Sequence, residues 1–232
     1  MYGFTQKTFE LLAVSMFYWL IPAAIVFTAV IIGLILYIKS KKVYHVHLNI
    51  TSFQNLHDEI VSDSFKEFAN KLQKRMGKRG VFLIGSIHPG ILPPQVPLQL
   101  AALLSKKRKC LIIEGDLKNN FLTKSIGHKR PDTLIQKQLV DTQFKSVKLW
   151  PAYNFTYFQH MNFAGVIRRA EDNYDYILLY APDLDGGMAC RSIVSSVEKA
   201  VIFQEGLEDE MLCKLIKEGQ CKIIAKVHVS MK

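Results

Sequence analysis

The sequence predicts a doubly wound α/β domain with a mostly parallel sheet, preceded by one transmembrane helix. Two observations predict the sheet: short apolar runs without polar alternation, and helical patterns between those runs. A third observation, a long uncharged stretch near the amino terminus, predicts the membrane helix. The chain has 232 residues, which is enough for that helix and one domain with its own hydrophobic core.

The predicted transmembrane helix covers residues 11–38, which carry no charged side chain. Its most apolar part, residues 19–38, is as long as the roughly 20 residues that span a bilayer. Three lysines follow directly within residues 39–42, whereas the preceding flank has one lysine and one glutamate. The positive-inside rule therefore predicts a short extracytoplasmic segment, residues 1–10, and a cytoplasmic carboxy-terminal domain.

The rest of the chain is expected to form a basic juxtamembrane linker, residues 39–54, and one α/β domain, residues 55–232. The chain has a net charge of +10, which is compatible with an anionic membrane surface, with nucleic acid, or with neither. Basic residues gather in two runs, 71–79 and 106–109, which are read as solvated surface. No nucleic-acid partner is therefore expected.

The helices and strands of the domain are predicted from the spacing of apolar residues and from the glycines and prolines between them. Apolar residues spaced by three and four predict an amphipathic helix over about 55–76, and glycines end it. Continuous apolar runs predict buried strands, and the segments between several of them predict helices. The predicted strands are 81–86, 110–114, 146–150, 175–180, 199–205 and 221–229, and the further helices are 98–105, 132–140, 157–173 and 207–218.

Four motifs occur along this domain in a recognisable order. They read DSFKEFANKL (63–72), VFLIGSIHPGILPPQ (81–95), CLIIEGDLKNN (110–120) and NYDYILLYAPD (173–183). Their order and spacing resemble the bacterial tyrosine autokinases, which form the cytoplasmic domains of capsule and exopolysaccharide chain-length regulators. These kinases belong to the MinD/ParA-like P-loop group, so the resemblance implies a P-loop NTPase-like fold.

The resemblance also identifies a degenerate phosphate loop. Pro89 and Gly90 match the family pattern, but Leu92 stands at the second glycine, Pro93 at the lysine and Pro94 at the hydroxyl residue that holds Mg²⁺. A working loop needs backbone N–H donors and one cation around the phosphates. Proline has no N–H, and leucine places a side chain where the backbone must approach phosphate.

The acidic positions of the family are only partly kept. Tyr180 stands at the Walker-B aspartate, while Glu114 and Asp116 stand at the two acidic positions that follow another strand. In the family these carboxylates serve Mg²⁺ and the attacking hydroxyl. Glu114 and Asp116 are therefore interpreted as vestigial, and the chain is expected to have no catalytic residue, no nucleotide cofactor and no metal ion.

The first motif resembles the helix through which the family assembles into rings. Asp63 matches its glutamate and Lys66 its first arginine, whereas Ala69 replaces its second arginine. Opposite charges at this spacing lie on one helix face. Asp63 and Lys66 are therefore the predicted contact with a partner or with a second copy of the chain.

The sequence hypothesis is a pseudoenzyme: a membrane-anchored pseudokinase in the bacterial inner membrane. It would act as a scaffold or regulatory subunit in exopolysaccharide or capsule synthesis, polymerisation or export, bound to the proteins of that machinery. The alternative is an atypical nucleotide-binding ATPase or tyrosine kinase of the same group that uses Glu114 and Asp116. A third interpretation is a basic protein that positions DNA or a membrane, which salt-sensitive DNA binding would favour.

Overall fold

The structure is a computed structural model, and it describes residues 22, 24–35, 43–49, 62–106, 108–129, 139–155, 162–185, 187–205 and 210–230. The chain divides into two compact units, Met1–Lys42 and Val43–Lys232.

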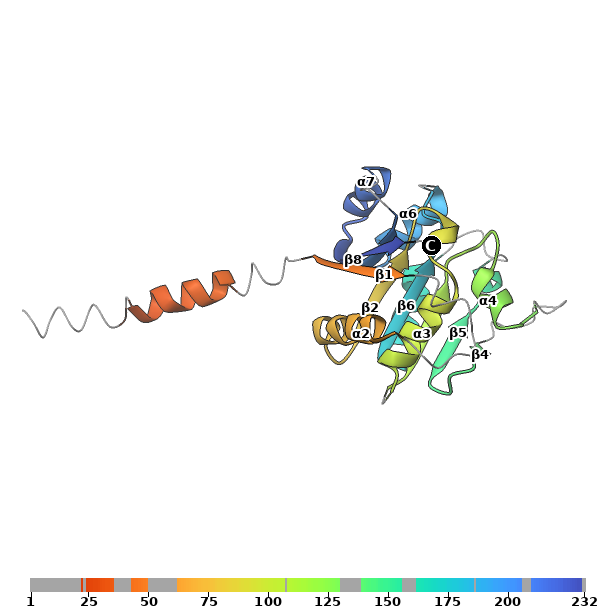
Figure 1. Cartoon of the computed structure of the whole chain (residues 1–232), viewed down its shortest axis with the longest axis horizontal. Helices are drawn as coiled ribbons and strands as arrows, with labels where there is room; N and C mark the ends of the chain where they lie inside the picture. Colours follow the sequence, from red (N-terminus) through yellow and green to blue (C-terminus); the bar gives the residue numbers. More distant parts are fainter. Residues whose placement is uncertain are drawn as a thin grey trace, which may run out of the picture. The chain divides into compact units, whose positions relative to one another are not determined.

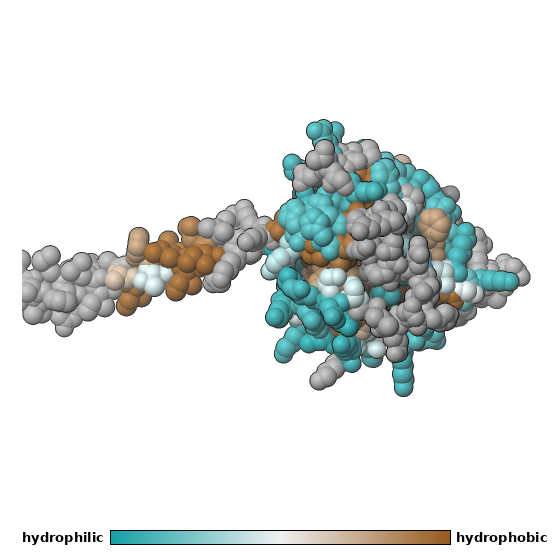
Figure 2. Space-filling model, viewed as in Figure 1, coloured by the Kyte–Doolittle hydropathy of each residue, from teal (hydrophilic) through white to brown (hydrophobic). Residues whose placement is uncertain are grey.

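In the amino-terminal unit, residues 24–35 are helical. Their large apolar side chains are exposed, Phe27 and Leu34 by more than half, and Figure 2 shows this helix as mostly hydrophobic surface. The predicted transmembrane segment, residues 11–38, lies partly outside the described residues. Within the described ranges, no helix combines the length and the apolar character needed to cross a membrane.

The second unit is built on one eight-stranded sheet with the order β1-β8-β7-β2-β6-β3-β5-β4 (Figure 1). All neighbouring strands are parallel except β4 and β5, which are antiparallel. The strands are β1 (Tyr44–Asn49), β2 (Gly80–Gly85), β3 (Cys110–Glu114), β4 (Val140–Asp141), β5 (Val147–Trp150), β6 (Tyr176–Ala181), β7 (Lys199–Gln204) and β8 (Lys222–Ser230).

Helices cover both faces of this sheet. The α-helices are α2 (Asp63–Met76), α3 (Gln95–Leu104), α4 (Phe121–Ser125), α5 (Phe163–Glu171), α6 (Met188–Ser195) and α7 (Glu210–Glu218), and the 3-10 helices are η2 (Pro89–Ile91) and η3 (Ala152–Phe155). One apolar cluster joins the sheet to α2, α3 and α4, and the other joins it to α5, α6 and α7. The buried residues of both clusters come from Val43–Lys232, so this unit contains a core of its own.

Successive residues of a strand supply opposite clusters, as the pleat requires. In β6, Tyr176, Leu178 and Tyr180 belong to the cluster with α2 and α3, while Ile177 and Leu179 belong to the other. All six residues of β6 are buried. A strand covered on both faces has no solvated side, which explains why the sequence shows an unbroken apolar run.

The predicted fold class is confirmed for the sheet and its helices, and all six predicted strands are present. The segment assigned to a linker, 39–54, instead contains β1, which extends the sheet beside β8. The first helix begins at Asp63 and not near residue 55, because Ser62 is its N-cap and accepts a hydrogen bond from Phe65 N. Residues 50–61, before that cap, lie outside the described residues.

Other predicted helices differ at their ends. Val140, predicted to end a helix, belongs to β4, and residues 130–138 lie outside the described residues. Helix α3 begins at Gln95, three residues earlier than predicted. Helix α5 begins at Phe163 and not at residue 157, because Asn162 is its N-cap and accepts a hydrogen bond from Gly165 N. The sequence analysis missed α4 and α6, because both are short and lack a long apolar period.

The strand order places one crevice at the carboxyl edge of the sheet. From β2 the chain crosses to β3 on one side, and from β6 it crosses to β7 on the other side. The direction of winding therefore reverses between β2 and β6, which are neighbours. In open α/β sheets, ligands bind outside the carboxyl ends of the strands at such a switch point.

Candidate functional site

The candidate site lies where β2, β3 and β6 end. After β2 the chain passes through Ser86 and η2 into α3. Ser86 is fully buried, and its hydroxyl lies 2.8 Å from the carbonyl oxygens of both His88 and Pro182. Its N–H donates to Ala181 O, and its carbonyl accepts from Leu184 N. The loop therefore begins joined to the segment after β6.

The loop between β2 and α3 is folded upon itself. Ile91 N donates to His88 O at 3.0 Å, so this N–H is already used within the loop. The prolines at 89, 93 and 94 have no N–H to offer. Ile91 and Leu92 are buried in the cluster beneath α3, and Leu92 has no exposed surface. This loop presents apolar side chains to the core at the place where a phosphate loop presents donors to its ligand.

Tyr180 closes the same loop from the sheet. Its ring is fully buried, and its hydroxyl donates to Leu92 O at 3.0 Å. Burial raises the pKa of Tyr180, and the nearby carboxylates of Asp116 and Glu114 raise it further. The hydroxyl therefore keeps its proton and remains a donor. The residue at the predicted Walker-B position thus holds the predicted phosphate loop by a direct hydrogen bond.

Glu114 lies opposite Tyr180 in the neighbouring strand β3 and is fully buried. Its Oε1 accepts from Leu122 N at 2.7 Å and Thr123 N at 3.1 Å, which are free donors of the first turn of α4. Its Oε2 bonds the Thr123 hydroxyl and accepts from Ala152 N at 3.2 Å. Burial raises the pKa of Glu114, and these hydrogen bonds counteract that rise. Both oxygens therefore join α4 and η3 to the sheet.

Asp116 also bonds its own loop. Its Oδ1 accepts from Asn119 N at 3.0 Å, and its Oδ2 accepts from Phe121 N at 3.2 Å. The side chain is almost completely buried. The structure thus brings Glu114 and Asp116 near Tyr180 and uses their oxygens to shape the turn into α4.

A cation that the sequence analysis did not single out lies beside this site. Lys118 Nζ is 2.6 Å from Asp185 Oδ2 and 3.6 Å from Asp183 Oδ2. The hydrogen bond from Lys118 lowers the pKa of Asp185 to about 2, and Gly187 N and the Cys190 thiol add to the effect. This aspartate therefore stabilises the fold above its unfolded pKa, near 4, and loses that contribution as pH falls through about 2. In the sequence, Lys118 could have been noticed only as a basic residue two positions after Asp116.

The two predicted contact residues, Asp63 and Lys66, pair with each other. Lys66 Nζ lies 3.1 Å from Asp63 Oδ1 in the first turn of α2, and both side chains are exposed. Ala69, which replaces the second arginine of the family motif, is buried against the sheet. The exposed face of this helix therefore carries the Asp63–Lys66 pair and a second ion pair, Glu67–Lys71, while the side chain at position 69 is buried.

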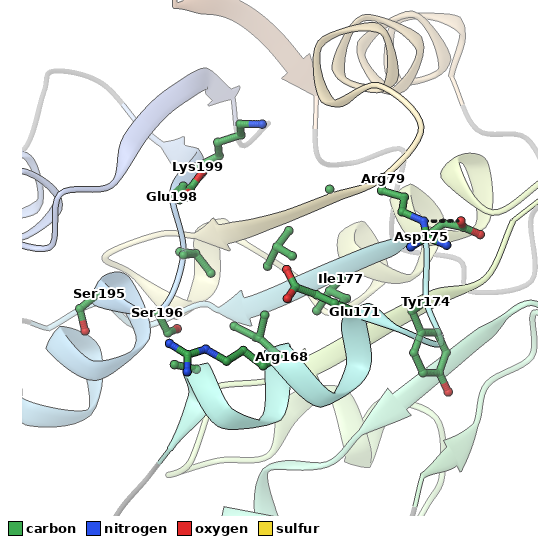
Figure 3. A pocket seen from close by; sticks show the side chains of 15 residues that line it. Arg79, Arg168, Glu171, Tyr174, Asp175, Ile177, Ser195, Ser196, Glu198 and Lys199 are labelled. Carbon is green, nitrogen blue, oxygen red and sulfur yellow. Dashed lines mark ion pairs between the residues drawn. The ribbon is translucent and has the colours of Figure 1, made fainter.

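Two of the cavities that the described residues form lie at the opposite, amino edge of the sheet. One, of about 590 Å³, lies between α5, α6 and the first residues of β2, β6 and β7 (Figure 3). The other, of about 560 Å³, lies between the end of α3 and the starts of β3 and β6. Arg79, Tyr174 and Asp175 line both cavities. Among the described residues, no group of three or more histidine, cysteine, aspartate or glutamate side chains is arranged to hold a metal ion.

These features define the class of fold. A mostly parallel sheet covered by helices on both faces, with a loop and helix after β2 and a switch point beside it, is a P-loop NTPase-like domain. No protein-family model matches the sequence, and no curated protein matches it.

Solved structures of bacterial tyrosine kinase domains share this fold. The kinase domain of the Escherichia coli tyrosine kinase ETK has a TM-score of 0.63 at 12% identity, with 83% of this chain and 91% of that chain covered. The chimeric protein CapA2B2 gives 0.62 at 13% identity, with coverages of 82% and 94%. The BceF tyrosine kinase domain gives 0.58 at 14% identity, with coverages of 79% and 83%. At these identities the likeness establishes the fold.

Proposed function

We propose that this protein is a membrane-anchored pseudokinase that acts as a scaffold or regulatory subunit in bacterial exopolysaccharide or capsule synthesis, polymerisation or export. The observation that carries the proposal is the hydrogen bond from Tyr180 to Leu92 O, made inside a fully buried loop. Phosphoryl transfer depends on positioned donors, a lysine and metal ligands around the phosphates. Here an aromatic ring and a leucine occupy the positions that those groups would need.

The place in polysaccharide assembly rests on the family resemblance and on the fold shared with tyrosine kinase domains. In this proposal the domain binds partner proteins as such a kinase domain would, but it does not catalyse phosphoryl transfer. Its partners would be proteins of the synthesis or export machinery, or a second copy of the chain, and α2 with Asp63 and Lys66 would form part of the contact. Its location would be the bacterial inner membrane, with residues 39–232 in the cytoplasm.

Nucleotide binding tests the catalytic part of this proposal. We expect the soluble unit, residues 43–232, to show no change in melting temperature on titration with ATP or ADP and Mg²⁺. A site that bound ATP and was filled at a hundred times its Kd would add about 2.7 kcal/mol, which is roughly 5–10 °C for a domain of this size. The ETK kinase domain, measured under the same conditions, is the positive control.

Two variants make this measurement specific. Replacing Pro93 by lysine and Pro94 by serine restores the family residues, yet we expect no nucleotide effect, because Leu92 and Tyr180 still fill the loop. A nucleotide-dependent rise in the native unit that disappears in Asp116→Asn would contradict the pseudokinase proposal. It would favour instead an atypical ATPase or kinase.

The orientation in the membrane is tested separately. A reporter active only in the cytoplasm, fused after Lys232 in a bacterial host, is expected to be active, because three lysines follow the apolar segment. The same fusion after removal of residues 1–38 is the control for membrane association, and it should appear in the soluble fraction. Activity of a periplasmic reporter at the same position would overturn the cytoplasmic location and every partner proposed from it.

A further inference from the structure

The cavity at the start of β3 and β6 is lined by more basic than acidic side chains. We call it the amino-edge basic pocket. Its basic residues are Arg79, Lys106, Arg108 and Lys109; its carboxylates are Asp172 and Asp175; and Ser105, Ser146, Asn173 and Tyr174 complete the lining. The lining therefore contains four basic and two acidic side chains around a cavity of about 560 Å³. Such a lining suits an anion with several oxygen acceptors.

The fold creates this pocket from two distant basic runs, 71–79 and 106–109. Both runs lead into strands, β2 and β3, that start at the same edge of the sheet. Arg108 joins them, because its guanidinium donates to Lys78 O. The same guanidinium lies 5.8 Å from the centre of the Tyr176 ring. The Tyr176 hydroxyl in turn donates to Gly77 O at 2.6 Å, so the position of Arg108 is fixed by both runs.

The carboxylates neutralise only part of this charge. Asp175 Oδ1 lies 3.6 Å from Arg79 Nε, an ion pair drawn in Figure 3, and Asp175 Oδ2 accepts a hydrogen bond from Lys109 N, so both oxygens are engaged. Lys106 and Lys109 are exposed. Across the described residues, neither ammonium has a carboxylate within ion-pair distance. Two cations thus remain available for a ligand.

The topology of the sheet indicates which source of anions lies near this edge. Strand β1 is parallel to β8, so Tyr44 lies at the amino edge of the sheet, the edge that carries the pocket. Only residues 39–43 separate Tyr44 from the predicted transmembrane segment. Five residues span at most roughly 18 Å. A chain anchored through that segment would therefore enter the domain on the basic side of the sheet.

We propose that the amino-edge basic pocket binds the phosphate groups of anionic lipids when the domain lies at a membrane surface. This inference rests on the proposed membrane anchor for the source of the phosphate. The cations of the pocket and the lysines of residues 39–42 would then act on the same leaflet.

Sedimentation of residues 43–232 with lipid vesicles tests the pocket without the anchor. We expect binding to vesicles that contain phosphatidylglycerol, weaker binding as salt is raised, and no binding to phosphatidylcholine alone. The double variant Lys106→Ala with Lys109→Ala should lower the partition coefficient by about fivefold for each lysine, or roughly 25-fold together. The matched control is Lys124→Ala with Lys129→Ala, which removes the same charge from exposed positions that follow β3 at the carboxyl edge.

The alternative outcomes separate this inference from the proposed function. Equal losses in the two double variants would mean that total charge and not the pocket attracts the vesicles, and would overturn the inference. Salt-sensitive binding to duplex DNA that depends on Lys106 and Lys109, without vesicle binding, would also overturn it and assign the pocket to nucleic acid. Either result leaves a cytoplasmic reporter and the pseudokinase proposal intact, whereas a periplasmic reporter contradicts that proposal whatever the vesicles show.

Discussion

Replacing Glu114 by alanine is expected to lower the free energy of unfolding of residues 43–232 by about 3–5 kcal/mol. The carboxylate is fully buried and bonds three backbone N–H groups and the Thr123 hydroxyl. Alanine leaves those groups buried without a partner, and each such loss costs about 1–3 kcal/mol before relaxation. Urea unfolding of the native unit and the variant measures the difference.

The control for this prediction is Glu114→Gln. The amide oxygen can still accept from Leu122 N and Thr123 N, while its NH₂ group faces Ala152 N, another donor. We expect a smaller loss of about 1–2 kcal/mol. If alanine and glutamine had equally small effects, Glu114 would not join α4 and η3 to the sheet, and its carboxylate would be available for another role.

Replacing Tyr180 by aspartate is expected to destabilise the domain by about 5 kcal/mol and to create no nucleotide site. The change restores the acidic residue that the family resemblance expects at this position. It also removes a fully buried ring and places a carboxylate beside Glu114 and Asp116. The loss of burial alone costs about 3–5 kcal/mol for an aromatic side chain. Urea unfolding and an ATP titration of the same sample test both parts.

A second pair of variants isolates the hydroxyl of Tyr180. Tyr180→Phe removes the hydrogen bond to Leu92 O, and Tyr176→Phe removes an equivalent bond to Gly77 O at the other edge of the sheet. Each should cost about 1 kcal/mol. Only Tyr180→Phe should speed amide hydrogen exchange at Gly90 to Leu92. Equal exchange in the two variants would show that the loop is held by its buried side chains alone.

The sequence predicted the central strands well because a strand buried on both faces is apolar at almost every position. The runs at 81–86, 110–114 and 175–180 are apolar at almost every position, and each became a central strand. β1 was missed because His45 and His47 interrupt its apolar run, and both histidines are exposed and stack on His228 of β8. An edge strand carries a weaker signal than a central one because fewer of its side chains are buried.

The roles of the residues at the candidate site depend on tertiary contacts. The family resemblance singled out Leu92, Tyr180, Glu114 and Asp116 motif by motif, and the structure places them at or just beyond the ends of β2, β3 and β6. The resemblance did not indicate that Glu114 bonds α4 or that Tyr180 bonds the loop, because both partners are backbone groups. Every residue except proline carries the same backbone N–H and C=O groups, so the sequence does not show which of them a side chain will bond.

The sequence by itself determined the apolar segment, the order of the strands along the chain, and the absence of lysine and hydroxyl residues at positions 93 and 94. These features depend only on which side chains follow one another. The tertiary structure decided which distant groups meet: Lys118 with Asp185, Tyr180 with Leu92, and Arg108 with the end of the other basic run. The physical reason is that parallel strands bring their ends to a common edge, so residues far apart in the chain share one environment only after the sheet has formed.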